Sequence, residues 1–281
     1  MTEVSEIMAA PVFAVSPKDN VARARNLMLR HGISRLVVAE GDNLKGIVTK
    51  KDIGMRLNQA EPQWRRRPID QIPVDLVATH DVISVKPDAQ IKDVASTMLS
   101  HNVSGLVVYD DAINGIVTKH DMVKYFTLLG SPFRVADMMS KKVVMVSRHH
   151  TVNHVIDTMV ENGTDRVVVR DGDSDTAYVG MVTLDDLGFA TMDFRDVKPI
   201  KEVHRAVPGG PKMLRGVRDV MMVAEDVMST PLVSVDRNTK ALDAAKIMLE
   251  KNFDMLPVIN GELQGEFNVE SILKWLSEAM E

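Results

Sequence analysis

The sequence predicts an α+β fold built from four copies of one β-α-β-β-α unit, which form two pseudo-two-fold pairs. Three observations predict this fold: a Gly-x-Val-Thr-x-x-Asp segment recurs along the chain, an apolar run precedes each copy, and an amphipathic helix pattern precedes each run. A unit of about 55 residues buries too little surface to be stable alone, so we expect the units to pair.

Each unit begins with a short apolar strand, expected at residues 12–15, 82–85, 143–146 and 232–235. The segment after each strand has apolar residues at positions i, i+3 and i+7, which lie on one face of a helix. We therefore expect an amphipathic helix that packs this face against the core of its unit. The apolar positions are Val21, Ala24 and Met28; Ile91, Val94 and Met98; Val152, Val155 and Met159; and Ala241, Ala244 and Met248.

Two further strands and a second helix complete each unit. The first of these strands is the apolar run at residues 36–38, 106–108, 167–169 or 256–259, and the second carries the recurring motif. The second helix is expected after the acid, for example at residues 53–57 and 122–126. The motif reads Gly46-Ile47-Val48-Thr49-Lys50-Lys51-Asp52, Gly115-Ile116-Val117-Thr118-Lys119-His120-Asp121, Gly180-Met181-Val182-Thr183-Leu184-Asp185-Asp186 and, in a degraded fourth copy, Gly265-Glu266-Phe267-Asn268-Val269-Glu270-Ser271.

Proline and glycine clusters mark the boundaries between units. We expect repeat 1 at residues 1–60, a linker and repeat 2 at 61–130, repeat 3 at 131–192, and a linker and repeat 4 at 193–281. The linkers contain Pro62-Gln63-Trp64-Arg65-Arg66-Arg67-Pro68 and Pro208-Gly209-Gly210-Pro211, whose proline and glycine residues interrupt regular structure.

Composition excludes several classes of function. The formal net charge of -5 and the acidic second half argue against a general nucleic-acid binder. The absence of cysteine excludes disulfides and thiolate chemistry and suits a reducing compartment. No leader pattern is present, and no apolar run approaches the ~18 to 20 residues that a membrane helix needs, so we expect a cytoplasmic protein without membrane contact.

The four units resemble CBS domains, named after cystathionine β-synthase, and their succession is similar to that of stand-alone archaeal and bacterial proteins with two tandem CBS pairs, or Bateman modules. The resemblance covers residues 4–57, 74–126, 135–191 and 223–277. It implies that two units associate through their sheets and form two clefts. In the family, regulatory ligands such as AMP, ADP, ATP or S-adenosylmethionine occupy these clefts, and no further cofactor is required.

The recurring Thr and Asp have two interpretations. A Thr just before a helix can cap that helix or donate to a phosphate oxygen, and an Asp three residues later can accept ribose hydroxyls or complete the cap. Three copies in one framework favour ligand contact, and the resemblance implies the same roles. The residues concerned are Thr49, Asp52, Thr118, Asp121, Thr183 and Asp186.

The residues around the motif favour the first pair as a phosphate site. Repeats 1 and 2 have basic residues between Thr and Asp, whereas repeats 3 and 4 have Asp185 and Glu270 there, which would repel phosphate. The loop before the central strand carries Ser34 and Arg35 in repeat 1 and Ser104 in repeat 2. Resemblance to energy-sensing kinase subunits implies that Arg35 contacts phosphate; the alternative is a solvated arginine. The basic candidates in the motifs are Lys50, Lys51, Lys119 and His120.

Repeat 3 offers Asp165, Arg166, Thr183 and Asp186, which suit a ribose better than several phosphates. Its cleft is expected to bind a less negative compound, such as S-adenosylmethionine or methylthioadenosine, or to stay empty. In repeat 4, Asn268 and Ser271 replace Thr and Asp, so we expect a structural role there.

Two other features have weaker functional interpretations. His150 and His154 share a helix face, as metal ligands can, but no confirming ligand stands at a suitable spacing nearby. The run 64–67 combines tryptophan with arginines, a mixture that binds single-stranded nucleic acid, but it is one short stretch in an acidic protein.

These observations predict a regulatory, non-catalytic sensor of an adenosine compound that signals to a protein partner through a change in conformation. The first pair is expected to bind AMP, ADP or ATP. The alternatives are a ligand-free scaffold and a sensor of S-adenosylmethionine or methylthioadenosine. No nucleophile-base constellation, zinc motif or P-loop supports an enzyme. The sequence leaves open the identity of the partner and whether the chain forms a homodimer.

Overall fold

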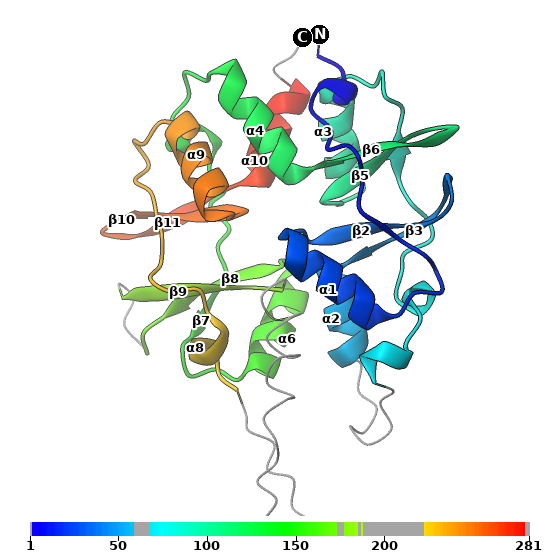
Figure 1. The fold of residues 1–281 in the computed structure, drawn as a ribbon. Coiled ribbons are helices and arrows are strands. Elements are labelled where there is room, and N and C mark those ends of the chain that lie inside the picture. Colours follow the sequence, from blue (N-terminus) through cyan, green and yellow to red (C-terminus); the bar gives the residue numbers. More distant parts are fainter. Residues whose placement is uncertain (1, 59–67, 173–176, 185–186, 188–221, 279–281) are drawn as a thin grey trace, which may run out of the picture.

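The computed structural model describes residues 2–58, 68–172, 177–184, 187 and 222–278. Four αβ units surround a common centre, with repeats 2 and 4 side by side at one end of the molecule and repeats 1 and 3 at the other (Figure 1). Repeats 1, 2 and 3 each have a three-stranded sheet in which a parallel strand flanks an antiparallel hairpin, and repeat 4 has a two-stranded sheet. The predicted α+β fold of four repeats is confirmed.

The first pair contains the expected elements in the expected order. Both second helices begin directly after the motif threonine, three residues earlier than predicted. Repeat 1 has η1 (Val4–Glu6), β1 (Ala14–Val15), α1 (Val21–His31), β2 (Arg35–Glu40), β3 (Asn43–Thr49) and α2 (Lys50–Asn58). Repeat 2 has η3 (Ile69–Gln71), η4 (Val74–Leu76), β4 (Ser84–Val85), α3 (Ile91–Ser100), β5 (Gly105–Asp110), β6 (Ala112–Thr118) and α4 (Lys119–Leu129).

The second pair repeats this order. The second helix of repeat 3 falls largely outside the described residues, and so do Asp185 and Asp186. Repeat 3 has α5 (Val135–Met138), β7 (Met145–Ser147), α6 (Val152–Asn162), β8 (Arg166–Arg170) and β9 (Tyr178–Thr183). Repeat 4 has α8 (Ala224–Val227), α9 (Ala241–Lys251), β10 (Met255–Asn260), β11 (Glu262–Asn268) and α10 (Val269–Glu278).

The strand predicted at 232–235 in repeat 4 is wrong. In repeat 3 the backbone N–H of Val168 donates to Val144 O at 2.9 Å, which helps to hold the flanking strand in place. Pro257 occupies the matching position in repeat 4 and has no N–H to donate. Only a single parallel bridge remains there, between Val235 and Val258.

The predicted helix faces are buried. Each of the twelve apolar positions listed for α1, α3, α6 and α9 is less than 9% exposed, and most are completely buried. The 3.6-residue period therefore identified the core face of all four helices.

The first residues of each repeat pack on the other repeat of its pair. Val4 N donates to Ala89 O at 2.8 Å, and Val4 lies in the hydrophobic core of repeat 2. Val74, which begins repeat 2, lies in turn in the core of repeat 1. The second pair repeats the exchange, because Val135 packs with repeat 4 and Ala224 with repeat 3. Each pair is therefore held together by two crossing segments.

The motif glycine lies where a crossing segment meets the hairpin. An added Cβ on Gly46 would be 2.9 Å from Thr79 O, and one on Gly180 would be 2.7 Å from Ser229 O. On Gly265 an added Cβ would overlap Ser140 O. Glycine is needed here because the backbone of the partner repeat comes too close for a side chain.

A continuous hydrophobic core joins the two pairs through repeats 2 and 4. Helix α10 packs against α3 and α4 (Figure 1), and the rings of Phe126 and Trp275 meet edge to face with centroids 5.2 Å apart. The described parts of repeats 1 and 3 instead have separate cores. The molecule is therefore closed at one end by apolar packing, and polar groups line its centre.

Within the described ranges, no helix combines the length and apolarity needed to cross a membrane. The same residues contain no group of three or more His, Cys, Asp or Glu side chains that could hold a metal ion. His150 and His154 pack edge to face, with ring centroids 4.2 Å apart.

Candidate ligand site

The motif Thr and Asp hydrogen-bond to each other in repeats 1 and 2. Thr49 Oγ1 donates to Asp52 Oδ2 at 2.7 Å, and the backbone N–H of Thr49 donates to the same oxygen at 2.8 Å. Thr118 and Asp121 have the same arrangement, with distances of 2.7 and 2.8 Å. The pair thus caps the second helix, as the structural interpretation requires. The arrangement leaves the second carboxylate oxygen, Oδ1, outside these bonds.

Repeat 4 reproduces this cap with different residues. Asn268 Oδ1 accepts hydrogen bonds from the backbone N–H and the hydroxyl of Ser271, both at 2.9 Å. Asn268 is 7% exposed, and its amide donates to Glu266 Oε1 at 2.6 Å. The degraded motif therefore retains the capping geometry but lacks the carboxylate of Asp.

The loop before each central strand lies beside the motif of the same repeat. The backbone N–H of Lys50 donates to Ser34 O at 2.9 Å, and that of Lys119 donates to Ser104 O at 3.1 Å. In repeat 3, Leu184 N donates to Asp165 O at 2.8 Å. In each of these three repeats, the structure thus brings together the loop before the central strand and the motif, the two segments that contain the candidate site residues.

The basic side chains of the first pair occupy different environments. Arg35 lies against Gly105, where an added Cβ would overlap its guanidinium, and its Nη2 donates to Ser34 Oγ at 3.4 Å. Lys51 and His120 are exposed, whereas Lys119 is 9% exposed. Lys119 is thus the member of the predicted phosphate set that lies inside the molecule.

A cavity of about 650 Å³ lies in the cleft of repeat 3. Ile156, Met159 and Leu184 form an apolar wall, while Thr164 and Asp165 contribute polar groups. Repeat 4 adds Glu266, Asn268 and Glu270, and Lys51 of repeat 1 also lines the cavity. The site is therefore built mainly by the second pair, and the first pair also contributes to its lining.

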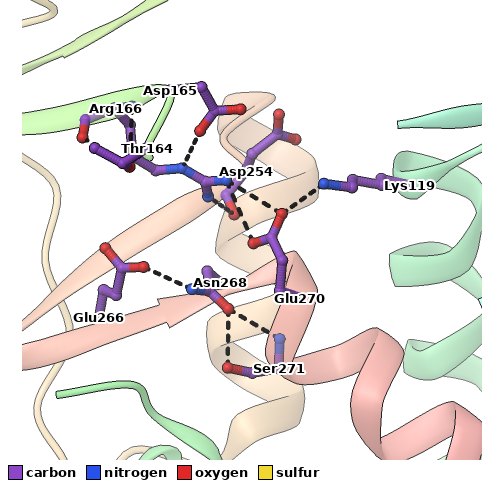
Figure 2. A network of polar contacts seen from close by, with 9 residues as sticks. All are labelled: Lys119, Thr164, Asp165, Arg166, Asp254, Glu266, Asn268, Glu270 and Ser271. Carbon is purple, nitrogen blue, oxygen red and sulfur yellow. Dashed lines mark hydrogen bonds and ion pairs between the residues drawn. The ribbon is translucent and has the colours of Figure 1, made fainter. Parts of the chain in front are cut away.

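Three charged residues of the lining, Asp165, Arg166 and Glu270, belong to a network of polar contacts (Figure 2). Lys119 Nζ lies 2.5 Å from Glu270 Oε1, and Arg166 Nη2 lies 3.2 Å from the same oxygen. Arg166 also donates from Nε to Asp165 Oδ1 at 2.8 Å and from Nη1 to Asp254 O at 3.1 Å. Residues from repeats 2, 3 and 4 thus meet around one carboxylate.

The network sets the protonation of its acids. Burial raises the pKa of Glu270, but Arg166 and Lys119 outweigh burial and leave this pKa below its ordinary value. The pKa of Asp165 is lowered in the same way, with burial opposed by Arg166, Lys119 and Lys51. Glu266 behaves oppositely, because burial raises its pKa more than Asn268 and Arg166 lower it. Glu270 and Asp165 are therefore the acids of the cavity whose charged form is favoured, whereas burial disfavours the charged form of Glu266.

The family model of the CBS domain matches residues 4–57, 71–128, 135–190 and 223–278. The chain belongs to the CBS domain family. Its four CBS repeats form the two pairs described above, as the resemblance implied.

Other proteins align with the whole chain or with part of it. The uncharacterized protein MJ1225 of Methanocaldococcus jannaschii is 24% identical over an alignment of 281 positions that covers 95% of each chain. The crystal structure of MJ1225, described as that of a candidate archaeal homolog of g-AMPK, aligns with a TM-score of 0.78 at 21% identity and covers 98% of this chain and 99% of that one.

Two further relatives match about half of the chain. The CBS domain-containing protein YhcV of Bacillus subtilis is 30% identical over 43% of this chain and 84% of its own length. The uncharacterized protein MJ1404 of M. jannaschii is 29% identical over 53% of this chain, and that match spans 35% of MJ1404.

From the sequence, repeat 4, which contains Glu270, was expected to have a structural role, and Glu266 was not among the candidate residues. Both acids line the cavity of CBS repeat 3 because the sheets of the pair face each other. The sequence feature that could have indicated Glu270 is its position in the motif of repeat 4, where repeats 1 and 2 have a basic residue. The spacing within repeat 4 could not show that this acid meets Arg166, 104 positions away.

Proposed function

We propose that the protein is a regulatory sensor that binds an adenosine-containing ligand in the cleft of CBS repeat 3. The observation that carries this proposal is the cavity of about 650 Å³, whose size lies within the range of small-molecule sites, ~300 to 1,000 Å³. Its apolar wall of Ile156, Met159 and Leu184 suits a purine ring, and the polar groups of Thr164 and Asp165 suit ribose hydroxyls.

The charge of the lining favours a ligand without phosphate. Asp165, Glu266 and Glu270 contribute carboxylates, and the guanidinium of Arg166 is already engaged by two of them. The other two cations of the lining, Lys51 and Lys142, are exposed, and Lys142 Nζ donates to Asn162 O at 2.7 Å. A phosphate group would approach these acids at short range, which raises the free energy of binding. Methylthioadenosine, which is uncharged, and S-adenosylmethionine, which carries a sulfonium cation, fit this lining better than AMP, ADP or ATP.

A second site in CBS repeat 1 is proposed for a phosphorylated adenosine ligand. Thr49 and Asp52 lie beside the Ser34 loop, and Arg35 and Lys51 are basic residues next to these two segments in the sequence. Ser104, Thr118 and Asp121 offer the matching polar groups in repeat 2, although Lys119 is paired with Glu270. AMP, ADP or ATP binding is therefore proposed for repeat 1 in preference to repeat 2.

Signalling follows from unequal binding. A ligand shifts the orientation of the pairs only if it binds one arrangement more tightly than another. The cavity touches repeats 1, 2, 3 and 4, so a ligand there contacts both pairs. We propose that a protein partner in the cytoplasm senses this change and that the chain itself catalyses no reaction.

The test is a thermal-shift titration of the purified protein with methylthioadenosine, S-adenosylmethionine, AMP, ADP and ATP. A ligand that binds only the folded state raises the melting temperature. Ile156→Trp, which fills the apolar wall, should remove the response to the first two compounds. Asp52→Ala should remove the response to the nucleotides and leave the others unchanged.

Three results would contradict the proposal. Absence of stabilisation by any of these ligands up to millimolar concentration would favour a ligand-free scaffold. An unchanged methylthioadenosine response in Ile156→Trp would place the site elsewhere. Ser271→Ala serves as the control in the degraded motif, and a loss of nucleotide response in this variant equal to that in Asp52→Ala would overturn the ranking of the repeats.

A further inference from the structure

We infer that the carboxylate of Glu270 is a built-in anion that occupies the phosphate position of the repeat 3 cleft and thereby excludes phosphorylated ligands. The inference rests on the proposed function for the choice of ligand. It concerns a specificity-determining residue that lies in the motif of a different repeat.

Two cations converge on one oxygen of Glu270. Lys119 Nζ lies 2.5 Å and Arg166 Nη2 lies 3.2 Å from Glu270 Oε1, and Arg166 Nη2 lies 3.3 Å from Oε2 (Figure 2). A lysine and an arginine aimed at one oxygen are the groups with which proteins bind a phosphate oxygen. The carboxylate therefore fills a position with the charge and donors of an anion site.

Both of these cations are buried. The side chains of Arg166 and Lys119 are 9% and 11% exposed, while that of Glu270 is 35% exposed. Two cations brought this far out of water need an anion beside them, because an unpaired buried charge is costly. In the described structure this anion comes from the protein itself, at the first turn of α10, where the helix dipole also favours negative charge.

Glu270 lines the cavity together with Arg166 and Asp165, so it lies beside the space proposed for the ligand. Glu270 stands in the motif of repeat 4 where repeats 1 and 2 have Lys51 and His120. A phosphorylated ligand would have to displace this carboxylate from both cations, whereas a ligand without phosphate would leave the network intact.

The main test is Glu270→Gln, which removes the negative charge and keeps the size of the side chain. We expect the affinity for AMP, measured by calorimetry, to rise by about tenfold or more, since a unit charge within ~4 Å of a phosphate costs at least that factor at a protein surface. The affinity for methylthioadenosine should change by less than about threefold. Glu266→Gln is the matched control, because it removes an acid from the same cavity and leaves the Glu270 ion pairs in place.

A second measurement needs no adenosine ligand. Inorganic phosphate should raise the melting temperature of Glu270→Gln, because it can replace the missing anion between Lys119 and Arg166. It should not do so for the wild type or for Glu266→Gln, compared with chloride at equal ionic strength. If Glu270→Gln folds poorly, its recovery on refolding with and without phosphate gives the same comparison.

The outcomes separate the two proposals. AMP binding by the wild type as tight as that of Glu270→Gln, or equal phosphate stabilisation of all three proteins, would overturn the role of Glu270. If the wild type bound no adenosine compound, the proposed function would fail, and the phosphate comparison would still decide whether Glu270 fills an anion site.

Discussion

The glycine that opens each motif acts through the contact that it allows between two repeats. Thr79, Ser229 and Ser140 each place a backbone carbonyl against the glycine of the partner repeat. A ligand-binding interpretation of the motif does not require this glycine in repeat 4. The packing of the pair does, which explains why Gly265 is present in a motif that has lost Thr and Asp.

We predict that Gly265→Ala destabilises the protein by about 1–3 kcal/mol, the usual cost of overpacking a tightly filled site. The new methyl group would meet Ser140 O, a backbone atom of the crossing segment that cannot move without loosening the pair. Urea unfolding measures the change. Gly105→Ala is the control, because its methyl group would first meet the flexible end of Arg35. Equal destabilisation by both variants would contradict this explanation.

The candidate site shows how far single residues can be interpreted from sequence. The spacing of Thr118 and Asp121 correctly indicated two side chains that interact at the start of a helix. The same spacing grouped Lys119 with His120 as partners of a phosphate, yet one is buried against Glu270 and the other is exposed. The partner of Lys119 lies 151 positions away, and only the packing of α4 beside α10 brings the two together.

At the scale of elements, local pattern predicted the longer helices and the hairpin strands of the repeats, but not the short helices η1, η3, η4, α5 and α8. The faces of α1, α3, α6 and α9 follow from hydrophobic periodicity alone. The crossing of the first segments between repeats could not be predicted, because Val4 satisfies the same local pattern whether it packs on its own unit or on the next. The missing strand of repeat 4 follows from Pro257, whose effect depends on a strand pairing that sequence does not show.

His80 lies within hydrogen-bond distance of two backbone carbonyls where the first residues of repeat 2 cross to repeat 1. The Nδ1 atom of His80 lies 3.2 Å from Lys45 O and its Nε2 atom lies 3.1 Å from Asp75 O. Both ring nitrogens must carry protons to donate to two carbonyls, and these hydrogen bonds raise the pKa of His80, with smaller contributions from Asp75 and Asp81. The charged imidazole thus links the start of repeat 2 to the β2–β3 hairpin of repeat 1.

We predict that His80 makes stability depend on pH in a defined direction. Because its folded-state pKa is raised above 6.5, its contribution is fully present below pH 6.5 and is lost as the pH rises through the raised value. His80→Gln should therefore lower the urea midpoint at pH 5.5 and leave it nearly unchanged at pH 9. His149→Gln, at an exposed position of repeat 3, is the control. An equal loss in His80→Gln at both pH values would show that the imidazolium is not responsible.

At the scale of the whole molecule, the two pairs are joined unequally. Repeats 2 and 4 share one hydrophobic core, while the described parts of repeats 1 and 3 have cores of their own and approach the charged cavity. Apolar packing is close-fitting and transmits strain, whereas a polar cavity can adjust around a ligand. A ligand in the cleft of repeat 3 would thus act away from the shared core of repeats 2 and 4, which holds the two pairs together.

This asymmetry predicts different effects for the same substitution in two repeats. Met98 and Met28 occupy matching positions on α3 and α1 and are almost completely buried, but Met98 lies in the shared core and Met28 in the core of repeat 1. Changing either methionine to Ala should lower the free energy of unfolding by about 2–5 kcal/mol.

The fluorescence of Trp275 on α10 reports on repeat 4, and Trp64→Phe makes Trp275 the sole tryptophan of the chain. Met98→Ala should lower the temperature at which Trp275 fluorescence changes by clearly more than Met28→Ala does. Equal shifts would mean that all four repeats unfold as one cooperative unit, since a single transition moves every probe together.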